Sequence, residues 1–240
     1  MDRQTRKELK TDKFTEGVGT GFEFLSEHRS QATRWGLIGV AVVVLVGGIW
    51  AYRSHQATVR TEALAKALQI DDASIGPPQP PHLSFPTVGD RDKARLAAFS
   101  DVAAKYPGTQ EGAIAKLAVA SAQSDGGQID DAVKTFQSIA DSSPAPYDSV
   151  GKLSLAQIYT SQGKTDEAEK LLRQLVDKPS VFVSKEQATL ALAQAIAKKN
   201  PTEARKLLTE LSASPRSVVS RAAVAELGTI APGSTPAQSN

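Results

Sequence analysis

Residues 126–140 read GGQIDDAVKTFQSIA, and residues 162–176 read QGKTDEAEKLLRQLV. The two segments align at a spacing of 36 residues: a glycine comes first, acidic residues and an alanine follow, and two large apolar residues come later. A further step of 36 residues reaches PTEARKLLTELSA, residues 201–213, with the same acidic, small and large positions. Repetition at a fixed period of about 20–50 residues is typical of stacked repeat architectures. This repeat therefore decides the predicted fold.

Each repeat predicts two helices joined by a tight turn. The glycine permits a positive φ at the turn, and the acidic residues after it cap the next helix and complement its dipole. The small alanine lets the two helices approach closely, and the apolar residues further along fill the groove on the same face. The predicted packing positions are Ala132, Phe136, Ile139, Leu155, Tyr159, Ala168, Leu172, Leu175, Ala204, Leu208 and Leu211.

A single helix pair leaves its apolar face uncovered, so the pairs have to stack. We expect an all-α fold in which residues 91–231 form an α-solenoid of about four degenerate helix pairs with a C-terminal capping helix. A helical bundle without superhelical stacking is the alternative. The first unit has a second helix at 91–105 but no first helix directly before it, and we expect residues 54–72 to be its partner. Residues 232–240 are expected to be a disordered tail.

The repeat resembles the tetratricopeptide repeat. That family's second-helix positions and late proline are matched by Ala132, Phe136, Ile139 and Pro144, and its Leu-Gly-x-x-Tyr signature by Leu155, Ala156 and Tyr159. The period of 36 departs from the usual length of about 34 residues. The resemblance implies that proteins or peptides bind on the concave side, which first helices line. The family's ligand-facing positions fall on Ser121, Ser124, Gln157 and Thr160.

Residues 35–52, WGLIGVAVVVLVGGIWAY, contain no charged side chain. As a helix they would be about 27 Å long, close to the thickness of a bilayer's hydrocarbon core. Trp35, Trp50 and Tyr52 stand at the two ends of the run, where aromatic rings favour the membrane–water interface. The apolar run is longer than that of a cleaved signal peptide and no cleavage site follows. We therefore expect a single transmembrane helix that acts as an uncleaved signal anchor.

The flanks of this run suggest its orientation. Seven Lys and Arg residues lie in residues 1–34 and three in residues 53–90, which favours a cytoplasmic tail before the span and a C-terminal domain outside. The two counts become similar when only the residues closest to the span are considered. Residues 53–74 are expected to be a stalk helix. Residues 75–90, with five prolines, are expected to be a stiff, extended linker.

The composition argues against catalysis. The chain has no cysteine, and His28, His55 and His82 lie far apart and outside the predicted repeats. The acidic pairs 130–131 and 166–167 recur at helix starts, where capping and the helix dipole favour them. No basic run is interleaved with aromatic residues, so nucleic acid is not an expected partner. We predict that the protein is not an enzyme and binds no metal or cofactor.

The order of these segments resembles the YfgM-like family, the ancillary subunits of the bacterial SecYEG translocon. The residues that carry this likeness are GFEFLSEHRSQATRWG, residues 21–36, together with the repeats. The resemblance implies a bacterial inner-membrane protein with its N-terminus in the cytoplasm and its repeats in the periplasm. Such a protein would be an adaptor that joins the translocon to periplasmic chaperones or secreted clients. The alternatives are a scaffold for cell-wall or outer-membrane assembly and, more remotely, a ligand-binding receptor or an enzyme.

Overall fold

The computed structural model describes residues 29–77 and 82–230. The chain divides into two compact units, Met1–Val59 and Arg60–Asn240, and each is described by itself. The expectations for most of the cytoplasmic tail, for the prolines at 78–81 and for the tail at 232–240 fall outside the described residues.

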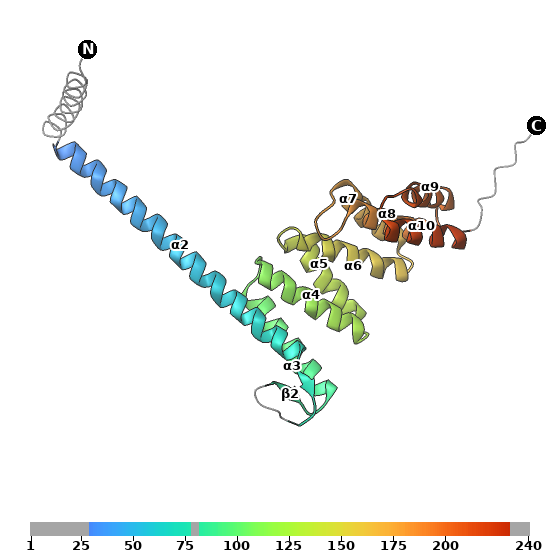
Figure 1. The fold of residues 1–240 in the computed structure, drawn as a ribbon, viewed down its shortest axis with the longest axis horizontal. Helices are drawn as coiled ribbons and strands as arrows, with labels where there is room; N and C mark the ends of the chain where they lie inside the picture. Colours follow the sequence, from blue (N-terminus) through green and yellow to red (C-terminus); the bar gives the residue numbers. More distant parts are fainter. Residues whose placement is uncertain (1–28, 78–81, 231–240) are drawn as a thin grey trace, which may run out of the picture. The chain divides into compact units, whose positions relative to one another are not determined.

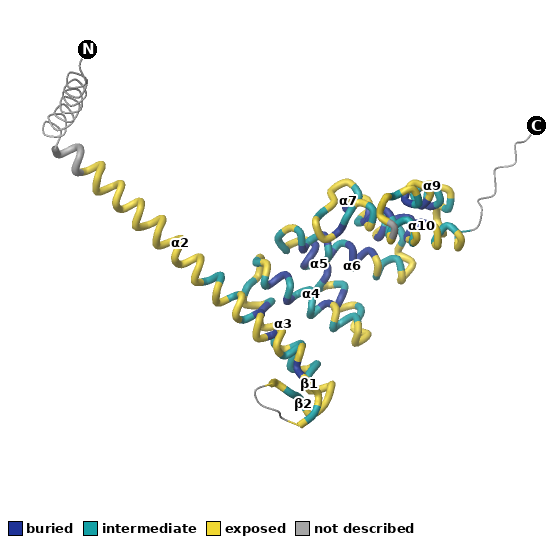
Figure 2. The backbone as a smooth tube through the Cα atoms, viewed as in Figure 1, coloured by how far each residue is buried: buried dark blue, intermediate teal, exposed yellow. Residues whose placement is uncertain are grey.

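Helix α2 (Arg29–Asp71) runs through the apolar segment without a break. Its sequence contains no proline and is rich in Ala, Val and Leu, so nothing interrupts the backbone hydrogen bonds. Among the described residues it is the one helix long and apolar enough to cross a membrane, and none of its most apolar window is buried. Large apolar residues such as Trp50 (73% exposed) and Val43 (71%) are exposed along it. Most of the described length of α2 has the colour of exposed residues in Figure 2.

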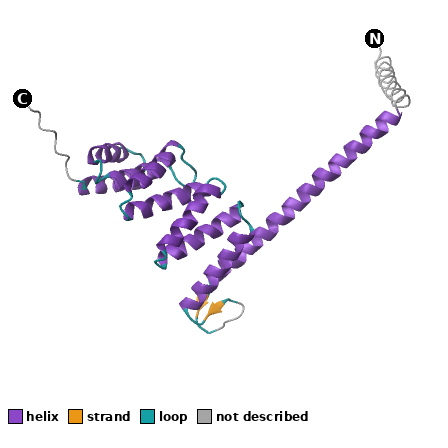
Figure 3. Cartoon of the chain, turned by 180° about the vertical axis from the view of Figure 1, so that it is seen from behind, coloured by secondary structure: helices purple, strands orange, loops and turns teal. Residues whose placement is uncertain are grey.

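The segment after α2 differs from the expected extended linker. Two short strands, β1 (Ser74–Ile75) and β2 (Ser84–Phe85), pair in parallel and appear in orange in Figure 3. The stalk helix ends at Asp71 rather than at residue 74, because the N–H of Ser74 donates to the carbonyl of Leu83 (3.1 Å) in this pairing. The residues on both sides of the prolines keep their N–H groups and can therefore pair, which the proline count alone did not reveal.

Helix α3 (Val88–Lys105) begins before residue 91, where the repeat domain was expected to start. Thr87 caps it by accepting a hydrogen bond from the N–H of Asp90 (3.1 Å). Leu64 and Ala67, in the part of α2 that follows Arg60, are buried in one cluster with Phe99 of α3. The end of α2 therefore packs against α3, as a first helix packs against the second helix of its repeat.

Three further helix pairs and one last helix follow. They are α4 (Gln110–Asp125) and α5 (Ile129–Ser142), α6 (Tyr147–Ser161) and α7 (Thr165–Asp177), α8 (Lys185–Ile196) and α9 (Pro201–Ser212), and then α10 (Ser217–Thr229). Each helix contacts the next along the chain (Figure 1). Gly127 and Gly163 form the turns within two of the pairs with φ of 74° and 73°. The predicted all-α solenoid with a capping helix is confirmed.

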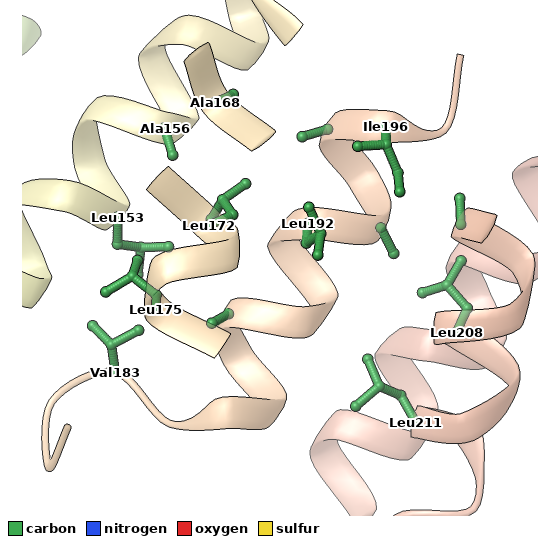
Figure 4. Packing of buried hydrophobic residues seen from close by; sticks show 14 of the residues in the cluster. Leu153, Ala156, Ala168, Leu172, Leu175, Val183, Leu192, Ile196, Leu208 and Leu211 are labelled. Carbon is green, nitrogen blue, oxygen red and sulfur yellow. The ribbon is translucent and has the colours of Figure 1, made fainter. Parts of the chain in front are cut away.

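The repeat alanines and leucines form the core. Ala132, Ala168 and Ala204 are fully buried where each second helix meets its first helix. The other packing positions are also buried, namely Phe136, Ile139, Leu155, Leu172, Leu175, Leu208 and Leu211. Figure 4 shows several of these side chains meeting between the helices of the C-terminal half. Tyr159 alone of the predicted set is half-buried, with the ammonium group of Lys164 5.5 Å from the centre of its ring.

Candidate protein-binding face

The first helices of successive repeats lie against one another. Helix α4 contacts α6, α6 contacts α8, and α8 contacts α10, whereas no comparable contact joins α3 to α5, α5 to α7 or α7 to α9. The backbones of the first helices therefore come close in one continuous layer, whereas those of the second helices lie farther apart, and α7 and α9 meet through the Arg173–Glu203 ion pair. We call the outward surface of α4, α6 and α8 the first-helix face. It is the side on which the sequence predicted partner binding.

The four predicted partner-binding residues differ in how open they are. Ser121 and Gln157 are exposed. Thr160 is half-buried, and its hydroxyl donates to the carbonyl of Ala156 (2.7 Å). The hydroxyl of Ser124 is buried and has no hydrogen-bond partner among the described residues. Ser121 and Gln157 are therefore the members of the set that a partner can reach. The hydroxyl of Thr160 is already hydrogen-bonded and that of Ser124 is buried.

The first-helix face is uncharged over much of its length. Residues 117–124 (LAVASAQS) and 153–161 (LSLAQIYTS) contain no Asp, Glu, Lys, Arg or His. The nearby lysines of these helices bond elsewhere: Lys116 donates to the Ser138 hydroxyl (3.0 Å) and Lys152 to the Asp148 carboxylate (2.8 Å). The face offers hydroxyl and amide groups among small apolar side chains. Such a surface suits neutral protein segments better than phosphate groups or nucleic acid.

Two hollows open between the second helices. One of about 370 Å³ lies among α3, α4 and α5, and one of about 320 Å³ lies among α5, α6 and α7. They follow from the packing, because the second helices do not fill the space between repeats. Lys116 borders the first and Lys152 the second, so these two lysines occupy equivalent repeat positions 36 residues apart. The predicted partner-binding residues border neither hollow.

A larger hollow of about 580 Å³ lies at the N-terminal ends of α4 and α6. Its lining residues are Arg60, Gly108, Thr109, Gln110, Glu111, Pro144, Ala145, Pro146, Tyr147, Val181 and Phe182. The last two belong to the loop between α7 and α8, which the sequence reasoning passed over. A feature of the sequence could have identified this loop: the apolar run VFV, residues 181–183, lies outside the helical periodicity and between two lysines.

A network of ion pairs connects neighbouring repeats. Arg173 of α7 bonds to Glu169 on the same helix and to Glu203 of α9, both at 2.8 Å. Lys199, in the turn before α9, bonds to Glu169 (3.1 Å) and to Asp166. The hydrogen bonds from Arg173 and then from Lys199 lower the pKa of Glu169 below its ordinary value. The network connects elements and does not surround a cavity.

Within the described residues, no group of three or more His, Asp or Glu side chains is placed to hold a metal ion. The acidic residues at 130–131 and 166–167 lie in the first turns of α5 and α7. A helix dipole stabilises negative charge in the first turn, and this explains the acidic residues at these positions without a catalytic or metal-binding role.

A family model described as a tetratricopeptide repeat-like domain matches residues 30–186, more than half of the chain. The chain belongs to the tetratricopeptide repeat-like family. No curated protein and no solved structure matches it.

Tetratricopeptide repeat-like domains are typically scaffolds for protein–protein interaction and are not catalytic. In this chain the matched residues extend from the apolar helix α2 to the start of α8. The fourth helix pair lies beyond the match. There the first-helix signature is replaced by Ala191, Leu192 and Ala195, so this tetratricopeptide repeat-like unit is recognised by its packing rather than by its signature.

Proposed function

We propose that this protein is a single-pass, membrane-anchored tetratricopeptide repeat-like adaptor, whose first-helix face binds other proteins on the extracytoplasmic side. The observation that carries the proposal is the continuous, uncharged first-helix face on a chain that also has an exposed apolar helix. Ser121 and Gln157 are the accessible polar groups of that face. They would bond the backbone of a bound segment while the small apolar side chains around them exclude water.

The membrane part of the proposal has its own support. Residues 35–52 carry no charge, and within the part of the chain that the structure describes nothing buries their most apolar stretch. In water such a helix would expose far more apolar surface than a soluble protein normally does. The Lys and Arg count favours a cytoplasmic N-terminus. The resemblance to the YfgM-like family adds a bacterial inner membrane with the repeats in the periplasm.

The identity of the partner rests on the resemblance to ancillary translocon subunits. It points to the translocon, to periplasmic chaperones or to secreted clients emerging from it. A client chain still in an extended state would present neutral backbone and small side chains, which the first-helix face can accept. A scaffold for cell-wall or outer-membrane assembly uses the same face and is the second candidate.

Co-purification separates these possibilities. The full chain, tagged and solubilised from native membranes, is compared with Gln157→Arg and with the matched control Gln174→Arg on α7, where the glutamine is also exposed. We expect translocon subunits or chaperones to co-purify with the wild type and the control, and to be reduced several-fold with Gln157→Arg. Recovery of cell-wall or outer-membrane assembly proteins instead would support the second candidate. Equal recovery with all three proteins would contradict binding at this face.

A further inference from the structure

The loop between α7 and α8 is held in one conformation. The hydroxyl oxygen of Ser180 accepts hydrogen bonds from the N–H groups of Phe182 (3.2 Å) and Val183 (3.0 Å). The N–H of Ser180 in turn donates to the carbonyl of Val183 (2.9 Å), and its hydroxyl lies 2.7 Å from that of Ser149 on α6. The side chain of Val183 is buried in the core. Hydrogen bonds and burial on both sides of the tip make this an ordered loop.

The tip of this ordered loop presents apolar side chains to the outside. Val181 is 87% exposed, the largest value among the exposed large apolar residues, and Phe182 is 48% exposed. The ring of Phe182 stands edge-on against Tyr147, with 5.2 Å between the ring centres. Pro144 and Pro146 extend the apolar surface along the same hollow. Adjacent apolar residues exposed on an ordered loop suggest that a membrane or another molecule covers this surface.

The loop lines a hollow together with a residue that follows the proposed membrane anchor closely in sequence. Val181 and Phe182 border the same hollow as Arg60, which belongs to the same compact unit. Arg60 follows Tyr52, the end of the apolar run, by only eight positions. Eight residues span at most about 28 Å in any conformation. The exposed loop is therefore tethered within a short distance of the bilayer surface if the anchor is inserted.

The charges around the loop suit a lipid surface. The exposed lysines Lys178 and Lys185 flank it on both sides. Among the nearby acids, Glu111 pairs with Arg60 (3.4 Å) and Glu186 with Arg216 (3.5 Å), and exposed Asp177 offsets part of the charge of Lys178 beside it. An apolar tip between two exposed ammonium groups matches the boundary between acyl chains and anionic headgroups, where lysine stems reach towards phosphate.

We propose that residues 178–185 contact the membrane surface, with Val181 and Phe182 placed in the headgroup boundary and the two lysines among anionic lipids. The inference rests on the proposed anchoring of α2. It adds a second, reversible contact that holds the repeats close to the bilayer and leaves the first-helix face for protein partners.

The chain contains no cysteine, so single cysteines can carry a fluorescent probe without background. An environment-sensitive probe is attached in turn to Val181→Cys, Tyr52→Cys and Gln162→Cys in the full-length protein, reconstituted in vesicles containing phosphatidylglycerol. Tyr52 reports on the anchor. Gln162 is the matched control, exposed in the turn at the opposite end of α6, about 22 Å along that helix from Tyr147. Lipids with a spin label near the headgroup are then added as quenchers.

We expect blue-shifted emission and strong quenching at Tyr52 and Val181, and neither at Gln162. Quenching at Val181 should weaken when phosphatidylglycerol is replaced by neutral lipid, because the lysines lose their partners. Quenching at Tyr52 but not at Val181 would overturn this inference and leave the anchor intact. A lack of quenching at Tyr52 would overturn the anchoring itself, and this inference with it.

Discussion

At the scale of single residues, Gly151 lets α6 pack tightly against α5 of the preceding repeat. A Cβ atom at this position would lie 2.8 Å from Cγ2 of Ile139 and 2.9 Å from the backbone nitrogen of Ala140. Because backbone and a fully buried side chain cannot move aside easily, Gly151→Ala should destabilise the repeats by about 1–3 kcal/mol. Urea unfolding measures the change. Gly228→Ala, where nothing lies within 4 Å of the added atom, is the control. Equal stability of the two variants would contradict the packing described here.

Leu172 tests the core of the repeats in the opposite way, by removing volume. The side chain is 1% exposed and packs in the cluster shared by α6 to α10. Leu172→Ala should lower the free energy of unfolding by about 2–5 kcal/mol, since the lost burial adds to the cost of the cavity. Val224→Ala removes apolar atoms from a side chain that is 57% exposed and should change stability little. Thermal denaturation measures the stability of both variants. A comparable loss of stability in both would be inconsistent with a core centred on Leu172.

The burial of Leu172 could be predicted from the sequence, whereas the close packing at Gly151 could not. Leu172 recurs at the repeat spacing as Phe136 and Leu208, so its burial follows from the pattern. Gly151 does not recur, because the equivalent positions hold Ala115 and Gln187. A contact made by only one pair of repeats leaves no periodic signal. It becomes visible only once the helices are placed.

At the scale of elements, the ion pairs between α7 and α9 make stability depend on pH. The pKa of Glu169 is lowered in the folded protein by Arg173 and Lys199, while the unfolded value is about 4.3. The stabilisation is therefore present above the unfolded pKa and is lost as the pH falls through the folded pKa. Glu169→Gln should cost about 0.5–1 kcal/mol at pH 7, as expected for partly exposed pairs.

Urea unfolding at neutral and at acidic pH provides the measurement. The difference between the wild type and Glu169→Gln should disappear in acid, and it should shrink at high salt because the pairs are screened. Glu210→Gln, which changes an exposed glutamate on α9, is the control and should show neither effect. A pH-independent difference would mean that Glu169 acts through packing rather than charge.

Some of the structural elements could be predicted from the sequence and others could not. The helix pairs and turn glycines follow from the 36-residue period and from the residues that turns require. The predicted capping by the acidic residues is wrong for α5 and α7, because the N-caps are Gln128 and Lys164 without a side-chain cap hydrogen bond and the acids lie in the first turns. The β1–β2 pair does not follow from the period, because its four residues are held by hydrogen bonds to a segment nine residues or more away. The ordered loop before α8 depends on Ser180 meeting Ser149, a contact between repeats. Pairings of this kind are tertiary and leave no local pattern.

At the scale of the whole molecule, the apolar part of α2 decides whether the protein is anchored. Val43 and Val44 lie in the middle of the uncharged run and are exposed. Two arginines there should cost about 2.5–3.5 kcal/mol each on insertion, so Val43→Arg with Val44→Arg should move the protein from the membrane to the soluble fraction. Alkaline extraction of membranes measures this distribution. Val218→Arg, on exposed α10, should stay with the membrane. If the double variant also resists extraction, the anchor lies elsewhere.

The candidate binding face was partly predictable at this scale. The resemblance placed it on the first helices, and the contacts between α4, α6 and α8 make those helices one layer. Which of the positions are open could not be read from the sequence. In the structure the hydroxyl of Thr160 is bonded to the carbonyl of Ala156, and the hydroxyl of Ser124 is buried.

The measurement that tests the adaptor function most directly is site-specific photo-crosslinking in native membranes. A photoreactive residue replaces Gln157 on the first-helix face, and the same residue replaces exposed Lys170 on α7 as the control. Adducts are identified by mass spectrometry. The account predicts that translocon subunits, chaperones or secreted chains are captured at Gln157 and not at Lys170. No adduct specific to Gln157 would contradict binding at this face and leave the protein without the function proposed for it.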